Sequence, residues 1–254
     1  MDDAKRLRAD REKTAFDTTN VWNNTLRLHR RFSHVFESPN TLFGEHWLEE
    51  KLAKLCQNAT VLDYGCGDGR AIPQYRAWGA RRIVGVDISE VFIAEARSKY
   101  GDLAEFHACD AQNLSMLEDS SVDVIFGRAI LHHLDFVAAM TEVRRVLRPG
   151  GTALFVEPLF DNPASMLFRK LTPNARTVDE RPLSRSQIAH ADRLFSSFDH
   201  RYCNLVTTPV GMVTSLLPLQ PDNAALLLAD RIDRKLAQTP LRHWMRLVFL
   251  CWVK

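Results

Sequence analysis

Three glycines at alternate positions follow directly on an apolar run in residues 61–70, VLDYGCGDGR. Glycines this dense let the backbone turn sharply and let a bulky ligand approach it closely. A strand followed by a glycine loop and a helix is the layout that holds nucleotide-containing ligands at the carboxyl ends of parallel strands. This stretch therefore favours a parallel α/β sheet with a ligand site at one edge.

The residues after the glycine loop alternate between strand-like apolar runs and helical patterns. Helical spacing of apolar residues occurs at 70–80, 90–100 and 135–147. The strand-like runs lie at 59–64, 82–88, 104–109, 122–127 and 151–157. Repeated β-α-β units predict a Rossmann-like, doubly wound α/β fold with helices on both faces of a mostly parallel sheet.

The remaining segments complete this prediction. Before the sheet we expect an N-terminal helical arm or lid at 1–43, with Trp22, Arg31, Phe32 and Phe36 as candidates to exclude water, and a helix at 44–56. A helix at 184–197 and strands at about 201–208 and 243–252 would make a seven-stranded sheet with an antiparallel C-terminal strand. Residues 44–254 would form one domain, with insertions at 158–182 and 209–238 as a roof over the substrate.

Composition narrows the class of protein. The 254 residues carry a formal charge of only +2, so charge alone does not indicate a nucleic-acid surface. The five cysteines are scattered without a CxxC pair, which argues against a zinc site or a disulfide framework and fits a reducing, cytoplasmic location. The N-terminus lacks the apolar region of a secretory signal, and LVFLCWV is too short for a membrane span.

The spacing of the glycines distinguishes between cofactors. A dinucleotide fingerprint is GxGxxG, whereas here Arg70 occupies the place of its third glycine. A nicotinamide-dependent dehydrogenase is therefore the less favoured alternative. Asp87 ends the second strand-like run, 24 residues after Asp63, where a carboxylate can accept both hydroxyls of a ribose. Asp110, after the third run, could accept a hydrogen bond from adenine N6, and Ile88 offers the ring an apolar face.

Together these segments resemble the class I S-adenosylmethionine-dependent methyltransferases, across roughly residues 45–157. VLDYGCGDG matches the family's acidic glycine loop, and GVDIS and HACDAQNL match its ribose and adenine strand ends. VDVIFGRAILHHL, EVRRVLRPGG and ALFVEP match the fourth strand, the next helix with its turn, and the fifth strand. The similarity is greatest to the branch of ubiquinone- and menaquinone-biosynthesis type, which methylates small molecules.

The resemblance implies a role for each matching residue. Gly65 and Gly67 would let the backbone pass the methionine part of S-adenosylmethionine, and Asp63 would orient its ammonium. Ile88 and Ala111 would flank adenine, while Gly127 or Arg128 would contact the methionyl group. The full expected set of cofactor-binding residues is Asp63, Tyr64, Gly65, Cys66, Gly67, Asp87, Ile88, Asp110, Ala111, Gln112, Gly127 and Arg128. S-Adenosylmethionine, released as S-adenosylhomocysteine, would be the only cofactor, with no metal.

Methyl transfer is an in-line displacement in which alignment supplies much of the acceleration. A general base is needed only where the acceptor must lose a proton. His132 and His133, just after the fourth strand, are the catalytic candidates, because neutral imidazole accepts a proton near pH 7. Packing or cofactor contact is the alternative for both. Glu157 is a weaker catalytic candidate that could instead orient a polar group of the substrate.

The class of substrate is limited mainly by motifs that the sequence lacks. The sequence GRAILHHL replaces the Asn/Asp-Pro-Pro-aromatic motif that amino-methylating enzymes of DNA and protein carry after the fourth strand. A small-molecule acceptor remains, and apolar residues in both insertions suggest an apolar, aromatic or lipid-like one. These residues could equally pack on the sheet or form a homodimer interface. A non-catalytic subunit that binds S-adenosylmethionine and activates a partner is the second alternative.

Overall fold

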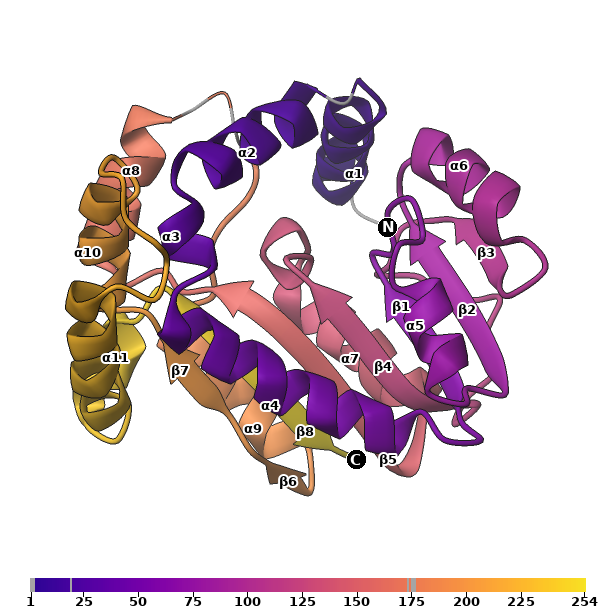
Figure 1. The fold of residues 1–254 in the computed structure, drawn as a ribbon. Coiled ribbons are helices and arrows are strands. Elements are labelled where there is room, and N and C mark those ends of the chain that lie inside the picture. The colour runs from indigo at the N-terminus through magenta and orange to yellow at the C-terminus, as the bar shows by residue number, and fades with distance from the viewer. Residues whose placement is uncertain (1–2, 19, 173, 175–176) are drawn as a thin grey trace.

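The computed structural model describes residues 3–18, 20–172, 174 and 177–254, without the side chains of 3–6, 20–22, 164, 168 and 171. Within these residues the chain forms one eight-stranded sheet in the order β3-β2-β1-β4-β5-β8-β6, with β7 also paired to β8 (Figure 1). Strands β1 to β5 run parallel, and β8 runs antiparallel to β5, β6 and β7. The strands are β1 (Thr60–Tyr64), β2 (Arg82–Asp87), β3 (Glu105–Ala108), β4 (Val122–Arg128), β5 (Leu147–Pro158), β6 (Ser197–Phe198), β7 (Arg201–Cys203) and β8 (Leu247–Val253).

Helices cover both faces of this sheet, as the alternating pattern predicts. One core lies under α4 (Pro39–Leu55), α5 (Ile72–Ala77) and α6 (Glu90–Tyr100), and the other under α7 (Phe136–Val146) and α9 (Arg185–Leu194). The central strand β1 is buried at every position because both of its faces are covered. The fold is therefore the doubly wound α/β sheet that the sequence predicts.

The carboxyl ends of β1, β2 and β4 meet at one edge of the sheet. Above this edge lie the N-terminal helices α1 (Asp3–Asp17), α2 (Asn20–Arg31) and α3 (Ser33–Phe36), drawn in indigo in Figure 1. Lys13 Nζ lies 2.6 Å from Glu90 Oε1, and Ser89 Oγ donates to Asp17 Oδ1 at 2.6 Å, so α1 is tied to the start of α6. The N-terminal segment thus covers the edge where a ligand is expected.

The C-terminal part departs from the predicted boundaries. The strand expected at 201–208 ends at Cys203, because Asn204 adopts a left-handed backbone (φ 74°) and α10 (Thr207–Thr214) begins soon after. The buried Asp233 accepts the backbone N–H groups of Leu205, Val206 and Thr207, which fixes this turn. An additional two-residue strand, β6, makes the sheet eight-stranded, whereas seven strands are expected.

Helices fill the two insertions. The first contains α8 (Pro163–Leu171), and the second contains α10 and α11 (Ala224–Leu236); short 3₁₀ turns lie at η1 (Leu131–His133) and η3 (Pro240–Trp244). Helix α4 begins at Pro39 rather than at residue 44, because Ser38 caps it by accepting the N–H of Thr41. None of the helices in the described residues is long and apolar enough to cross a membrane.

Candidate functional site

The glycine loop has the sharply turned backbone that its sequence requires. Gly65, Gly67 and Gly69 have φ angles of 80°, 51° and 80°, which side chains other than glycine rarely adopt. The N–H groups of Gly65 and Cys66 both donate to Val86 O at 2.9 Å, which ties the loop to the end of β2. The loop is therefore fixed at the edge of the sheet that the N-terminal helices cover.

Asp87 connects this loop to the next helix. Its Oδ2 accepts the N–H of Gly67 at 2.9 Å, and its Oδ1 accepts the N–H of Ser89 at 2.9 Å. Burial raises the pKa of the Asp87 carboxyl, and these backbone donors partly offset that effect. Each carboxylate oxygen keeps a second lone pair, so Asp87 can still accept hydrogen bonds from a ligand.

Half of the expected cofactor-binding residues line one cavity of about 40 Å³ at this edge. Those residues are Gly65, Asp87, Ile88, Asp110, Ala111 and Gln112. Side chains from α1 cover the cavity, with Glu12 and Phe16 among its lining residues. Because ligand cavities usually hold about 300 Å³ or more, a nucleotide-sized ligand requires α1 to shift outward.

Asp63 lies at the end of β1, buried beneath the glycine loop. Its Oδ1 accepts a hydrogen bond from the hydroxyl of Tyr75 at 3.4 Å, whereas its buried Oδ2 has no hydrogen-bond partner within the described residues. Burial raises the pKa of the Asp63 carboxyl to about 7, and the neighbouring Asp87 adds to the rise. An orphaned buried carboxylate oxygen suits a cationic ligand, which a sulfonium cofactor with an ammonium group would supply.

The other expected residues serve the loop and its surroundings. Tyr64 is fully buried, with its hydroxyl donating to Ala111 O at 2.7 Å, so it supports the segment after β3 from the core. Cys66 is also buried. A side chain at Gly127 would lie within 2.6 Å of Phe155, so close packing requires glycine there. Arg128 forms a two-pronged ion pair with Glu45 at 2.8 and 2.7 Å.

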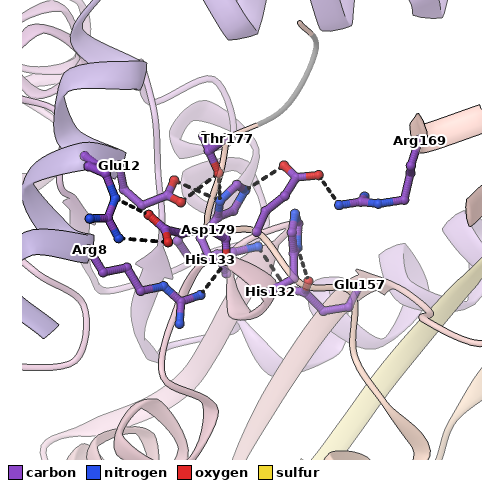
Figure 2. A network of polar contacts seen from close by, with 11 residues as sticks. Arg8, Glu12, His132, His133, Glu157, Arg169, Thr177 and Asp179 are labelled. Carbon is purple, nitrogen blue, oxygen red and sulfur yellow. Dashed lines mark hydrogen bonds and ion pairs between the residues drawn. The ribbon is translucent and has the colours of Figure 1, made fainter. Parts of the chain in front are cut away.

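Two of the three catalytic candidates, His132 and Glu157, form a buried pair (Figure 2). His132 Nδ1 lies 2.7 Å from Glu157 Oε2, while Glu157 Oε1 accepts the backbone N–H groups of Ile130 and Leu131 at 2.9 and 2.8 Å. Glu157 is therefore held within the protein and positions both the loop after β4 and the imidazole. Burial, followed by the charge of His133, lowers the pKa of His132 below its usual value.

His133 belongs to a second network, which joins α1 to the segment after α8 (Figure 2). Its Nδ1 lies 3.0 Å from Glu12 Oε2 and 3.2 Å from Thr177 Oγ1. Glu180, which also pairs with Arg169 on α8, lies 4.0 Å from His133 Nε2. Glu12, Arg169 and Glu180 could not be predicted as site residues, because no motif distinguishes them from other charged residues of the sequence.

One group of side chains in this network could hold a metal ion. A ring nitrogen from His132, another from His133 and a carboxylate oxygen from Glu180 all lie within 4.8 Å of one another. The guanidinium of Arg169 pairs with the same carboxylate and opposes the approach of a cation. The absence of a metal stays a prediction.

Comparison with known proteins places this geometry in a family. The methyltransferase domain family matches residues 62–155, which run from within β1 through the glycine loop and into β5. Residues 62–155 therefore form a methyltransferase domain, and this match supports the class I S-adenosylmethionine-dependent methyltransferases as its family. This bears out the resemblance of the glycine loop, and neither the dehydrogenase nor the non-catalytic subunit is favoured by the comparisons.

Individual relatives match the methyltransferase domain over part of their length. A probable S-adenosylmethionine-dependent methyltransferase from Mycolicibacterium smegmatis is 36% identical over 117 residues, which are 43% of this chain and 42% of that protein. Demethylmenaquinone methyltransferase from Chlorobaculum parvum is 31% identical over 111 residues, covering 44% of this chain and 45% of that protein. The similarity thus spans less than half of the length of these relatives.

A solved structure shows the same fold over a longer stretch. An S-adenosylmethionine-dependent methyltransferase from Mesorhizobium loti superposes with a TM-score of 0.58 at 20% identity, covering 83% of this chain and 98% of that one. At this identity the likeness concerns the fold of the methyltransferase domain.

Few of the apolar insertion residues expected to form the roof line a cavity. Leu159 and Met212 do so, together with Phe32 and Phe36 of the N-terminal arm, in a second, apolar cavity beside the end of β5. Exposed to solvent are Phe160, Leu167, Val213, Leu216, Leu217, Leu219, Leu227 and Leu228. The side chains of Trp22 and Phe168 lie outside the described part of the chain. Only a minority of the apolar insertion residues therefore face the space where an acceptor could bind.

Proposed function

We propose that this protein transfers a methyl group from S-adenosylmethionine to a small-molecule acceptor. The observation that carries the proposal is the meeting of Gly65, Asp87, Ile88, Asp110 and Ala111 around one covered cavity at the carboxyl edge of the sheet. When bound, S-adenosylmethionine would supply a methyl group activated by a positively charged sulfur. The surrounding carboxylates favour such a cation electrostatically.

Each part of the cofactor has residues that fit it. Asp87 would accept the ribose hydroxyls, and Asp110 the exocyclic amine of adenine between Ile88 and Ala111. The orphaned Oδ2 of Asp63 would face the ammonium, directly or through water. Glu12, buried on α1 and lining the same cavity, adds negative charge from above.

His132 is the candidate general base for acceptors that must lose a proton. Since Glu157 Oε1 already accepts two backbone N–H groups, Glu157 Oε2 is best satisfied by the N–H of His132 Nδ1. This tautomer leaves His132 Nε2 unprotonated and able to accept a proton. Glu157 would then act as a positioning residue, which modifies the expectation that it contacts the substrate.

The apolar cavity next to Glu157 is the candidate acceptor site. Pro158 and Leu159, which follow Glu157 on β5, line it together with Phe32 and Phe36. An acceptor bound there would lie beside the His132–Glu157 pair. The nature of the cavity supports an apolar or aromatic small molecule, and the nucleophile can be oxygen, nitrogen or carbon.

The test is transfer of tritiated methyl from S-adenosylmethionine by the full chain to a panel of aromatic and medium-chain alcohols, amines and acids. We expect transfer to at least one acceptor class, with stoichiometric release of S-adenosylhomocysteine. Cofactor binding without transfer to any of them would contradict the proposal and favour the non-catalytic subunit.

The role of the pair is tested separately on the same acceptor. For a proton-losing acceptor, His132→Asn should lower kcat by about 10²-fold or more, since general bases contribute 10²–10⁴-fold. Glu157→Gln should lower kcat and alter the pH profile with little change in KM. The matched control is His46→Asn, at an exposed position on α4. Unchanged kcat in both variants would remove the base from the mechanism.

A further inference from the structure

The apolar cavity beside Glu157 is lined by an arginine, Arg246, whose positive charge is not neutralised by the other described lining residues. The cavity, of about 190 Å³, lies between α2, α3, the end of β5, α8 and α10. Its walls are mostly apolar, and two guanidinium groups, Arg169 and Arg246, also line it. Glu180 forms an ion pair with Arg169, whereas no carboxylate among the described side chains forms an ion pair with Arg246.

Arg246 directly precedes β8 and is held there by its backbone. Its N–H donates to Asn204 O at 3.0 Å, and its carbonyl accepts the N–H of Leu159 at 3.0 Å. The guanidinium donates from Nη2 to Val35 O at 3.2 Å and lies 5.1 Å from the centre of the Phe36 ring. These contacts aim the side chain at the inner wall of the cavity.

The guanidinium lacks a negatively charged partner among the described side chains. Its buried Nε has no hydrogen-bond partner there, and burial lowers its pKa to about 10. Glu45 is near enough to oppose this shift, but Glu45 pairs with Arg128. Because a buried cation without a counter-ion is costly, the arrangement is suited to a bound anion.

We propose that the acceptor is an amphiphilic anion, with its apolar body in this cavity and its carboxylate or phosphate group on Arg246. The inference rests on the proposed methyl transfer and adds the charge of the substrate to it. The nucleophilic end would then point toward the His132–Glu157 pair, since Pro158 and Leu159 join that pair to the cavity wall. Leu28, Phe32 and Met212 would contact the body.

Four probes with the same eight-carbon chain separate the contributions of charge and body. They are octanoate, octyl phosphate, octanol and octylammonium, titrated calorimetrically into the full chain saturated with S-adenosylhomocysteine. We expect one or both anions to bind at least tenfold more tightly than octanol, and octylammonium to bind most weakly. The tighter of the two anions identifies the group that Arg246 recognises.

Substitutions in the cavity test whether the anionic probes bind at Arg246. Arg246→Leu should bring the affinity for the anion down to that for octanol, whereas Arg246→Lys should keep part of the difference. Arg231→Leu, at an exposed position on α11, is the matched control and should change neither. If Arg246→Leu does not fold, Met212→Trp decides, because it fills the cavity with Arg246 intact and should abolish binding of every probe.

Several results would overturn the proposal. These are equal affinity for octanol and the anions, no binding of either anion, or unchanged anion binding in the folded Arg246→Leu or Met212→Trp protein. S-Adenosylhomocysteine affinity, measured on the same samples, distinguishes this failure from failure of the proposed function. Cofactor binding with no anion binding overturns only the acceptor inference, whereas absence of cofactor binding contradicts the methyltransferase proposal.

Discussion

Asp63 and Asp87 are the carboxyls at the proposed cofactor site whose pKa burial raises. Asp87 has two backbone donors, but Asp63 has only the Tyr75 hydroxyl and an orphaned Oδ2. Ionising Asp63 in the empty protein is therefore unfavourable. A bound cation would favour the ionised carboxylate. The same buried group therefore lowers the folding stability of the empty protein and raises its affinity for a cationic ligand.

The Asp63 carboxyl predicts a pH dependence of stability. Its pKa is about 7 when folded and 3.8 in the reference state, so the folded chain binds the proton more tightly. Stability from this group is present below pH 3.8 and is lost as pH rises through 7. We expect Asp63→Asn to stabilise the cofactor-free protein at pH 8 by up to about 4 kcal/mol, at about 1.36 kcal/mol per pKa unit, with a much smaller gain at pH 5.

Urea unfolding at the two pH values measures this effect. Asp102→Asn, at an exposed turn, is the control that removes the same charge without burial. The same Asp63 substitution should weaken S-adenosylmethionine binding. A variant that is equally destabilised at both pH values would show that Asp63 is a structural residue instead.

The meeting of Asp87 and Asp110 at one cavity is predictable from sequence because strand ends fix their positions. Asp87 and Asp110 follow parallel strands, and the carboxyl ends of such strands meet at one edge. The roles of Glu157 and Arg246 were not predictable. Each depends on which backbone groups lie opposite in space: Glu157 bonds to residues 26 and 27 positions away, and Arg246 to Val35 across the chain.

Helix α1 covers the cavity proposed for the cofactor. Arg11 Nε and Nη2 bond to the two carboxylate oxygens of Asp179 at 2.6 and 2.9 Å, and Glu12 accepts from Thr177 Oγ1 at 2.7 Å. These contacts join α1 to the segment after α8, over the cavity. Opening for a nucleotide-sized ligand must break or stretch them.

Arg11→Ala should therefore let α1 open more often. We expect the association rate of S-adenosylmethionine to rise several-fold in stopped-flow fluorescence, with faster amide exchange in residues 7–17. Arg27→Ala, at an exposed position on α2, serves as the control. An unchanged association rate together with unchanged exchange would mean that α1 does not limit entry.

At the element scale, prediction succeeded where burial alone determines structure. The runs at 59–64 and 82–88 became β1 and β2 within one residue, because strands covered on both faces are continuously apolar. The strand at 201–208 was too long because Asp233, which is far along the chain, captures the backbone of 205–207. The sequence pattern does not contain such long-range side-chain bonds.

At the scale of the whole molecule, the histidine networks connect the proposed cofactor cavity with the apolar cavity proposed for the acceptor. His133 lines the first cavity and Arg169 the second, and Glu180 lies between the two side chains. Movement of α1 or α8 would therefore shift lining residues of both cavities. The alternative role for His132, His133 and Glu180 is to bind a metal cation.

Chelation distinguishes these explanations. We expect methyl transfer and S-adenosylmethionine affinity to survive prolonged treatment with EDTA, because Arg169 pairs with the carboxylate that a cation would need. The measurement is initial rate before and after chelation. Loss of rate that a divalent ion restores, and that Glu180→Gln prevents, would instead establish a metal at His132, His133 and Glu180.

The central claim is that the covered edge of the sheet binds S-adenosylmethionine, and calorimetric titration of the full chain tests it most directly. S-Adenosylmethionine and S-adenosylhomocysteine are titrated beside NAD into the native protein, Asp87→Ala and the exposed control Asp102→Asn. We expect micromolar binding of both sulfur ligands, weakened at least tenfold by Asp87→Ala and unchanged in Asp102→Asn. Binding of NAD instead, or undiminished affinity in a folded Asp87→Ala protein, would contradict it.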